Sequence, residues 1–510
     1  MHKNVGVVSL IGAGPGDPGL ITIRGRHLLE KADVVVYDAL ANPALLEYVP
    51  PAAERIDVGK RVGDHRVPQE QINELLRSRA EAGKRVARLK GGDPYLFGRG
   101  AEEVAFLGRH GIPVEVVSGV TAGLAAPATA GIPLTHRDHA STVTFVTGHE
   151  DPAKPGSAVD YTVLAGLVRA GGTLCFYMGL RRLERIAQAL IDGGSEPETP
   201  LAVVESGTWP SQRNLRSTLR EAAAVTSRMG LAGPAVIVVG AVAGLVEPGL
   251  DWFTSRPLFG CTIVITRSRH QSSRLRIRLA EAGAEVIEAP TIVIRPTDDI
   301  AHLHKVIRTL DDYDWLVLTS VNGVDSLARR FADLDVDARH LAGVRVAAIG
   351  PATSAALRHG LGVRVDLEPP RFVAESLAEV LITEGVRGCR ICLWRAKVAR
   401  PVLPRLLRQA GAEVDEIAVY ETHVADTLPE QVKTALGDGR ADWVTFTSSS
   451  TVRNMVELLG TDRDVLERVK IASIGPVTSQ TIREFGYRPT VEAERSDIEG
   501  LTTAIIAAEA

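Results

Sequence analysis

Cysteine is scarce in this sequence, with four in 510 residues. Four thiols are too few for the disulfide framework of a small secreted protein, and they fit a reducing compartment. Cys389 and Cys392 form a C-x-x-C pair, but they lie in RGCRICLWRA, whose apolar residues predict a buried strand. No second pair completes a zinc ligand set, and the segment His136–His139 has no further ligand set beside it. We therefore expect neither disulfides nor a bound metal.

Long apolar runs and an excess of one charge are also missing. No run of about 18 apolar residues occurs, and the start, MHKNVGVVSLIGAGPG, lacks the pattern of a signal peptide. Lys and Arg number 58 against 62 Asp and Glu, a net charge of −4. This balance gives no global basic field that would attract nucleic acid or an anionic membrane. We therefore expect a cytoplasmic protein with neither nucleic acid nor membrane as a partner.

The chain is too long for one hydrophobic core, so several compact units are expected. Short β-branched runs alternate with helical stretches, which predicts α/β layers built mainly on parallel sheets. In the first half these runs are VGVVSLIG, ADVVVYD, RVARLKGG, VEVVSG, STVTFVTG, TLCFYMG, PLAVVESG and AVIVVG. The series stops near Leu250, where the Pro, Gly and Ser residues of EPGLDWFTSRP predict a linker over 246–257.

The region after the linker repeats itself. GAEVIEAP at Gly283 returns as GAEVDEIAVY at Gly411, LTSVNG returns as FTSSST, and VAAIGPATSAAL returns as IASIGPVTSQTI. Gly283 and Gly411 are about 128 residues apart, half of this region, which indicates two similar lobes rather than a solenoid. Each lobe is expected to be flavodoxin-like, with a ligand in the cleft between them. On the repeat alone, a two-lobed binding protein remains an open alternative.

The first strand of the chain runs into a glycine-rich loop, VSLIGAGPGDPGL. A dinucleotide fingerprint needs G-x-G-x-x-G opening a helix, whereas Asp17 takes the place of the third glycine and Pro15 and Pro18 interrupt the turn. Asp38 would be the ribose-binding carboxylate of that scheme, and we treat this match as a decoy. A nicotinamide-linked oxidoreductase joined to a sensor domain stays as the competing class of function.

A wider set of motifs across residues 6–240 carries a family resemblance. In chain order they are GAGPGDPGLIT, VVYD, VGKR, VPQEQIN, RLKGGDPYLFGRGAEE, SGVTAG, GIPLTHRD, VTGHE, FYMGL and VVESGT. This set resembles the uroporphyrinogen-III C-methyltransferase branch of the tetrapyrrole methylases. The resemblance implies a domain over 1–245 that holds S-adenosylmethionine between two α/β subdomains, about 1–117 and 118–245. The residues implied to hold the donor are Pro15, Gly91, Gly92, Asp93, Leu96, Thr121, Ala122, Met178 and Gly207.

The implied chemistry is an in-line methyl transfer, for which a protein mainly holds donor and nucleophile in near-attack geometry. Asp38 and Lys60 match family positions proposed as general base and general acid. Asp38 can instead end a strand and cap the next turn, and Lys60 can be a solvated loop cation. An anionic macrocycle needs cations. Those in motif loops are Lys60, Arg61, Arg66, Lys90, Arg99 and Arg137, whereas Lys84, Arg85 and Arg88 are expected to form a surface run.

The second half carries a second resemblance. ITRSR, LTSVNG, IGPATS, VYET, FTSSS and IGPVTS follow in this order, and the set resembles uroporphyrinogen-III synthase. That family implies a two-lobed domain over 258–510, with lobe one formed by 258–294 and 425–510 and lobe two by 295–424. The segments TIVIRP and VYETHV would then form the hinge between the lobes.

The implied synthase reaction needs no cofactor, because hydroxymethylbilane loses water and closes with inversion of ring D. Tyr420 matches the residue that assists departure of the hydroxyl, although it can also be a tyrosine packed against strand ends. Thr353, Ser448 and Thr478, with helix N-terminal amides, are implied to bind substrate carboxylates, and Arg267 to supply positive charge. Ser and Thr at such turns also cap helices, so this second interpretation stays open for each of them.

Together the resemblances predict a bifunctional enzyme. It would convert hydroxymethylbilane to uroporphyrinogen III and methylate that product at C2 and C7, with two S-adenosylmethionine, to precorrin-2 for sirohaem or cobalamin. An alternative keeps the methyltransferase and makes the second half a non-catalytic tetrapyrrole-binding module. The methyltransferase family also implies a homodimer.

Overall fold

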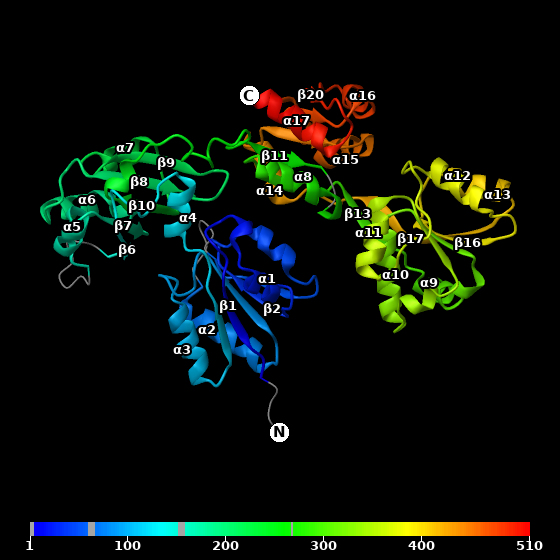
Figure 1. Cartoon of the computed structure of the whole chain (residues 1–510), viewed down its shortest axis with the longest axis horizontal. Helices are drawn as coiled ribbons and strands as arrows, with labels where there is room; N and C mark the ends of the chain where they lie inside the picture. Colours follow the sequence, from blue (N-terminus) through cyan, green and yellow to red (C-terminus); the bar gives the residue numbers. More distant parts are fainter. Residues whose placement is uncertain (1–4, 60–66, 151–158, 267–268) are drawn as a thin grey trace. The chain divides into compact units, whose positions relative to one another are not determined.

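The computed structural model describes residues 5–59, 67–150, 159–266 and 269–510 (Figure 1). Lys60, Arg61, Arg66 and Arg267 lie outside the described residues. The chain forms two compact units: Met1–Ile263 with Leu275–Val286 and Ile505–Ala510, and Val264–Arg274 with Ile287–Ala504. None of the described helices has both the length and the apolar character that crossing a membrane requires.

The first sheet is wholly parallel, in the order β3-β2-β4-β1-β5. Its strands are β1 Val8–Gly12, β2 Val34–Tyr37, β3 Glu54–Asp57, β4 Val86–Lys90 and β5 Val114–Val117, and its helices are α1 Ile23–Leu29, α2 Gln69–Glu81 and α3 Gly100–Arg109. Leu10 packs on the side of α2 and α3, and Ile11 packs on the side of α1. Both faces of the sheet are covered, which explains why the strands read as continuous apolar runs.

The second sheet is mixed, in the order β6-β7-β10-β8-β9. Its strands are β6 Thr142–Thr147, β7 Gly172–Tyr177, β8 Pro200–Glu205, β9 Arg213–Thr218 and β10 Ala235–Val239, and its helices are α4 Ala122–Thr129, α5 Tyr161–Arg169, α6 Leu183–Asp192 and α7 Ala222–Arg228. Only β6 and β7 pair in parallel; β10 pairs antiparallel with β7 and β8, and β8 with β9. The prediction of mainly parallel sheets is wrong here. The connection 206–212 is too short for the crossover that a parallel pair needs.

The third and fourth sheets have the flavodoxin-like strand order that the repeat predicts. The third runs β12-β11-β18-β19-β20, and the fourth runs β13-β17-β16-β14-β15. Numbered along the chain, the third sheet has the order 2-1-3-4-5 of a doubly wound fold. The fourth has the equivalent 2-1-3-4 order over β14 to β17, with β13 added as an antiparallel edge. The predicted α/β class and flavodoxin-like architecture are therefore confirmed.

The elements of these two sheets follow one another regularly along the chain. The strands are β11 Thr262–Ile265, β12 Glu285–Glu288, β13 Ile292–Pro296, β14 Trp315–Leu318, β15 Arg345–Ala348, β16 Arg390–Ala396, β17 Glu413–Val424, β18 Trp443–Phe446, β19 Lys470–Ser473 and β20 Val491–Glu492. The helices are α8 Arg269–Glu281, α9 Ile300–Arg308, α10 Val321–Asp333, α11 Pro351–Gly360, α12 Ala374–Glu384, α13 Val402–Gln409, α14 Glu430–Gly437, α15 Ser449–Leu459, α16 Pro476–Glu484 and α17 Ile498–Glu509. Short 3₁₀ helices are Pro18–Leu20, Pro43–Tyr48, Leu180–Arg182, Ala241–Gly244, Leu310–Asp312, Ala338–Leu341 and Gly460–Glu467.

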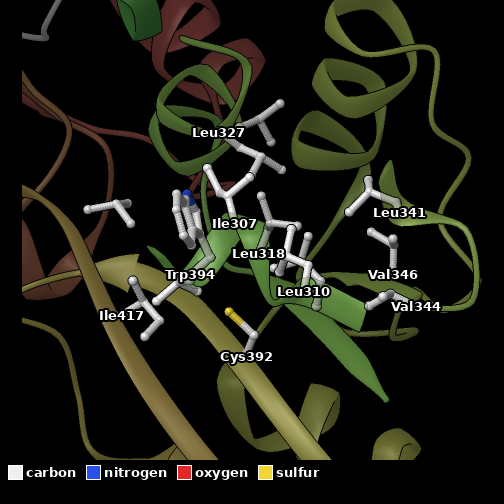
Figure 2. Packing of buried hydrophobic residues seen from close by; sticks show 14 of the residues in the cluster. Ile307, Leu310, Leu318, Leu327, Leu341, Val344, Val346, Cys392, Trp394 and Ile417 are labelled. Carbon is white, nitrogen blue, oxygen red and sulfur yellow. The ribbon is translucent and has the colours of Figure 1, made fainter. Parts of the chain in front are cut away.

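Two separate cores cover the faces of the fourth sheet. Strand β14 alternates between them: Leu318 packs with α9, α10 and α11, whereas Trp315 packs with α12 and α13. Figure 2 shows Leu318 beside Leu327 of α10 and Trp394 of β16 in the first of these cores. Cys392 belongs to the same core and is completely buried. Cys392 therefore lies in a buried strand, as its apolar neighbours predicted, whereas Cys389 precedes the strand and is half-buried.

Candidate functional sites

Three glycines lie in backbone contact at the carboxyl ends of β1, β4 and β5. A Cβ on Gly119 would lie 2.2 Å from the Gly92 carbonyl oxygen, and one on Gly12 would lie 2.4 Å from the Gly119 nitrogen. The Gly92 N–H donates to the Gly14 carbonyl at 2.7 Å. No side chain fits between these loops, because real Cβ contacts do not approach so closely. The glycine-rich motifs are therefore required by close packing of the three loops.

Gly92 is less tightly packed on its Cα side than Gly12 and Gly119. It has a φ of +67°, and the nearest atom to a Cβ placed there is the Ala122 nitrogen at 3.9 Å, at the start of α4. The Asp93 carboxylate shapes the surrounding loops, since it accepts from the Tyr95 and Leu96 amides at 2.7 and 3.1 Å and from the Gly119 amide at 3.1 Å. The group that this turn can present to a ligand is therefore the main chain at Gly92.

Tyr177 orders the start of α4, beside Gly92. Its hydroxyl lies 2.8 Å from Thr121 Oγ1 and accepts from the Gly123 amide at 2.8 Å. Burial raises the pKa of Tyr177 to about 12, and its hydrogen bond to Thr121 opposes that shift. The phenol therefore stays neutral at ordinary pH. A Cβ on Gly123 would meet the phenol oxygen at 2.2 Å, so glycine is needed to admit this hydroxyl. The sequence motif contained Tyr177, but only the fold shows its role.

Backbone strain is concentrated in the same loops. The described residues other than glycine with positive φ are Phe97, Arg99, Met178, Ser206, Thr208 and Asp335. All of these except Asp335 lie in the loops after β4, β7 and β8. Between Ser206 and Thr208, Gly207 packs so tightly on α4 that a Cβ would lie 2.2 Å from the Ala126 Cβ. Such strain persists only where surrounding contacts enforce it, and it is typical of ligand-binding sites.

Two contacts join the first glycine-rich loop to the loop after β8. The Asp17 amide donates to Thr208 Oγ1 at 3.0 Å, and Gly16 lies against the indole of Trp209, where a Cβ would be 2.1 Å from Nε1. Asn42 also donates to the Gly16 carbonyl at 2.7 Å, which holds the chain beside Pro15. The structure thus brings together in adjoining loops all nine residues implied to hold the donor: Pro15, Gly91, Gly92, Asp93, Leu96, Thr121, Ala122, Met178 and Gly207.

Gly119→Ala is expected to separate the loops after β1, β4 and β5. The added methyl would overlap backbone atoms, so the chain must shift, at a cost of about 1–3 kcal/mol in stability. Isothermal titration should show weakened binding of S-adenosylmethionine, together with a lower Tm. Gly108→Ala is the matched control in the same subdomain, because nothing lies within 4 Å of a Cβ there. Equal donor affinity in both variants would contradict the close-contact explanation.

A buried charge network lies under Asp38. Arg88 Nη2 donates to Asp38 Oδ1 at 2.6 Å, and Arg88 Nε lies 3.4 Å from Glu103 Oε1. Lys90 Nζ and Gln69 Nε2 each donate to the same Glu103 oxygen at 3.0 Å. The exposed fractions are 2% for the Arg88 side chain, 5% for Lys90, 0% for Glu103 and 30% for Asp38. Two cations and two anions therefore compensate one another, and only Asp38 reaches the surface.

This network corrects two predictions. Arg88 is not part of a surface run, and Lys90 is not a loop cation available to a substrate: both lie in β4, and both are buried and paired. Asp38 ends β2 and is held by Arg88, which also argues against its use as a ribose ligand. Sequence reasoning missed Glu103. The available signal was the pair of cations inside an otherwise apolar strand, since buried charges require partners.

Glu103→Gln is expected to destabilise the first sheet. It leaves Arg88 and Lys90 with Asp38 as the remaining carboxylate, and removal of one member of a buried ion network costs about 3–5 kcal/mol. Thermal unfolding should show a lower transition for this part of the chain. Glu81→Gln on α2 is the control, because Glu81 pairs with Arg77 on the surface. Equal Tm values for the two variants would show that the buried charges contribute nothing.

Apart from the buried Lys90, the described cations proposed for the macrocycle, Arg99 and Arg137, are exposed. Arg99 pairs with Glu102 through both carboxylate oxygens, at 2.9 and 2.6 Å. That hydrogen bond raises the pKa of Arg99 and lowers the pKa of Glu102. Arg137 is exposed on the loop before β6. An anionic ligand at Arg99 would therefore have to share the guanidinium with Glu102.

The described synthase residues lie in β17, opposite the last residue of β16, and at the starts of three helices. Tyr420 is 8% exposed, and its hydroxyl lies 2.9 Å from Ser320 Oγ. Thr353 and Thr478 are the third residues of α11 and α16, each preceded by a glycine that provides no side-chain cap. They are 4% and 5% exposed, so both threonines are buried in these turns. Ser448 caps α15 in a reciprocal pair with Thr451. Sequence reasoning missed Ser320.

Both halves of the chain match known families. Residues 7–223 match Tetrapyrrole (Corrin/Porphyrin) Methylases, and residues 273–503 match Uroporphyrinogen-III synthase HemD. The porphyrin biosynthesis protein HemD of Ruminiclostridium josui is 36% identical over 502 residues, which cover 98% of each protein. The chain belongs to the same family as this HemD protein. It carries a tetrapyrrole methylase domain followed by a HemD domain, and the two resemblances seen in the sequence are confirmed.

Two further relatives match the methylase half. The S-adenosyl-L-methionine-dependent uroporphyrinogen III methyltransferase of Methanosarcina barkeri is 48% identical over 245 residues, which cover 48% of this chain and 95% of that protein. Among solved structures, the uroporphyrin-III C-methyl transferase of Thermus thermophilus complexed with S-adenyl homocysteine has 40% identity and a TM-score of 0.40, over 46% of this chain and 98% of that one.

Proposed function

We propose that the methylase domain, within residues 1–245, transfers methyl groups from S-adenosylmethionine to C2 and C7 of uroporphyrinogen III. The observation that carries this proposal is the set of strained loops gathered around Gly92 and the first turn of α4. Main-chain groups there suit a small, folded donor, which would supply an electrophilic methyl group. The Methanosarcina barkeri relative, whose name states S-adenosyl-L-methionine-dependent methylation of uroporphyrinogen III, supports the proposed donor and substrate.

Asp38 is the residue of this domain proposed to accept a proton. Its carboxylate is partly exposed, and Arg88 holds it from below at 2.6 Å, so its position is set before a substrate binds. Lys60 is the proposed acid, and Arg61, Arg66, Arg99 and Arg137 are proposed to bind the macrocycle's carboxylates. Precorrin-2 is the product that follows from two transfers.

We propose that the HemD domain, within 258–510, cyclises hydroxymethylbilane to uroporphyrinogen III. Tyr420 is proposed to assist loss of the hydroxyl, and the glycine-led first turns at Thr353 and Thr478 are proposed to bind carboxylates through their amides. Ser448 and Arg267 complete the proposed substrate set. The product of this half is then the substrate of the other.

A coupled assay tests the two activities together. Purified full-length protein given hydroxymethylbilane and S-adenosylmethionine is expected to form a dimethylated type III product, measured by chromatography and mass spectrometry. Formation of the type I isomer alone, while supplied uroporphyrinogen III is still methylated, would assign the second half a non-catalytic binding role. Lack of methylation with both substrates would defeat the proposal for the first half.

Asp38→Asn tests the proposed base. It is expected to lower kcat for methyl transfer about 10²- to 10⁴-fold, the usual contribution of a general base. Donor affinity, measured by titration, should stay near that of the unmodified protein. Asp33→Asn is the matched control, because Asp33 precedes the same strand and also pairs with an arginine, Arg85. A small, equal effect of both substitutions would remove Asp38 from the chemistry.

A further inference from the structure

The two lobes of the HemD domain differ at one repeated position. In the motif LTSVNG, Ser320 caps α10, and in its counterpart FTSSST, Ser448 caps α15. The third helical residue is Gly323 in α10 and Thr451 in α15, and Thr451 returns a hydrogen bond to the Ser448 backbone. Gly323 has no side chain to do this. The hydroxyl of Ser320 is instead 2.9 Å from the hydroxyl of Tyr420.

The partner of Ser320 has no counterpart in the other repeat. In the sequence aligned on Gly283 and Gly411, Tyr420 corresponds to Ile292, whose side chain cannot form a hydrogen bond and which lies in β13 beside β17, after the chain has left the third sheet. The pair Ser320–Tyr420 therefore belongs to one lobe of a duplicated fold. Helix capping alone does not explain it, because Ser448 caps its helix while its hydroxyl lies 2.9 Å from that of Ser450 in the same helix, not from a strand residue.

Both members of the pair are held rigidly. The indole of Trp394, which is completely buried, donates to the Gly323 carbonyl at 3.0 Å and fixes the first turn of α10. Tyr420 lies at a register shift between β16 and β17. Arg395 pairs with Ala418, but the next residue, Ala396, pairs with Tyr420, so β17 has one extra residue here. Such a bulge re-aims side chains beside functional sites. Val419 and Tyr420 consequently pack in the same core, although neighbours in a regular strand face opposite ways.

We propose that Ser320 is a positioning residue for Tyr420, and that it donates its hydroxyl hydrogen to the Tyr420 oxygen. The Gly323 amide donates to Ser320 Oγ at 3.1 Å and takes up one of its acceptor sites, and the proposed direction of the 2.9 Å contact uses the hydroxyl hydrogen of Ser320 for Tyr420. Tyr420 then keeps its own hydrogen for a substrate. This proposal rests on the proposed synthase function.

The movement of the proton explains how the Ser320–Tyr420 hydrogen bond would assist the reaction. The Tyr420 O–H bond breaks as its proton joins the departing hydroxyl oxygen, the C–O bond breaks, and water leaves. The bilane then carries a positive charge and Tyr420 a negative one. Hydrogen bonds to an ionised oxygen are about twice as strong as neutral ones, so the chain from Gly323 through Ser320 stabilises this state more than the starting one. Ring closure releases one proton, which returns to Tyr420.

The experiment compares variants of the full-length chain with hydroxymethylbilane as substrate and the type III isomer as the measured product. Ser320→Gly removes the hydroxyl, whereas glycine remains a tolerated helix cap. We expect kcat to fall about 10- to 100-fold, the range for one hydrogen bond to a charged group, with KM changed less. Ser320→Thr, which keeps the hydroxyl, should restore most of the rate.

Asp299→Gly is the control for capping, because Asp299 caps α9 by accepting from the His302 amide at 3.1 Å. It should lower Tm about as much as Ser320→Gly and leave kcat unchanged. Methylation of supplied uroporphyrinogen III by the same preparations should also be unchanged.

A double-mutant cycle with Tyr420→Phe decides whether Ser320 acts through Tyr420. If it does, adding Ser320→Gly to a chain that already carries Tyr420→Phe should lower kcat by no more than about twofold. Any of three results would overturn the proposal while the synthase function stands. They are a double variant whose kcat falls by the product of the two single effects, a wild-type kcat in S320G, and a wild-type kcat in Y420F. A parent chain that forms no type III isomer would overturn the synthase function itself, and this proposal with it.

Discussion

The carboxyl ends of parallel strands meet at one edge of a sheet, and both halves of this chain place their candidate sites where strands end in this way. In the first sheet, β1, β4 and β5 end at Gly12, Lys90 and Val117, and the loops that follow them are in backbone contact. In the fourth sheet, β14 ends at Leu318, two residues before Ser320. The arrangement is that of doubly wound folds, in which ligands bind at the carboxyl ends of strands. The loops can carry chemistry because the sheets below them are rigid.

The fold class and the donor-site loops could be predicted because their signals are local. Strand runs, linker composition and glycine motifs are each read within a few residues, and the repeat reports the lobe architecture directly. The mixed second sheet could not be predicted in this way. Strand β9, RNLRST, alternates poorly and has one buried residue, Leu215. Its pairing with β8 depends on the short connection between them.

The parts of the sites that escaped prediction depend on partners far apart in the chain. Arg88 meets Asp38 across 50 positions, and Ser320 meets Tyr420 across 100. The sequence around each of these residues does not identify its partner. A buried charge needs compensation, so Arg88 inside an apolar strand requires a carboxylate, but the sequence does not say which of the 62 acidic residues provides it.

Duplication gives the HemD domain an internal reference for separating structure from function. A feature present in both repeats, such as a serine cap after a central strand, is accounted for by the needs of the fold. A feature present in one repeat alone needs another reason. Tyr420, with Ile292 at the matching position, is such a feature, and so is the missing reciprocal cap at Gly323. Without that cap the Ser320 backbone N–H lacks the side-chain acceptor that Thr451 gives Ser448, while the Ser320 hydroxyl caps α10 and contacts Tyr420. This lobe therefore lacks one stabilising contact at the helix whose cap, Ser320, is hydrogen-bonded to Tyr420. Such a loss of stability is expected where a site serves function.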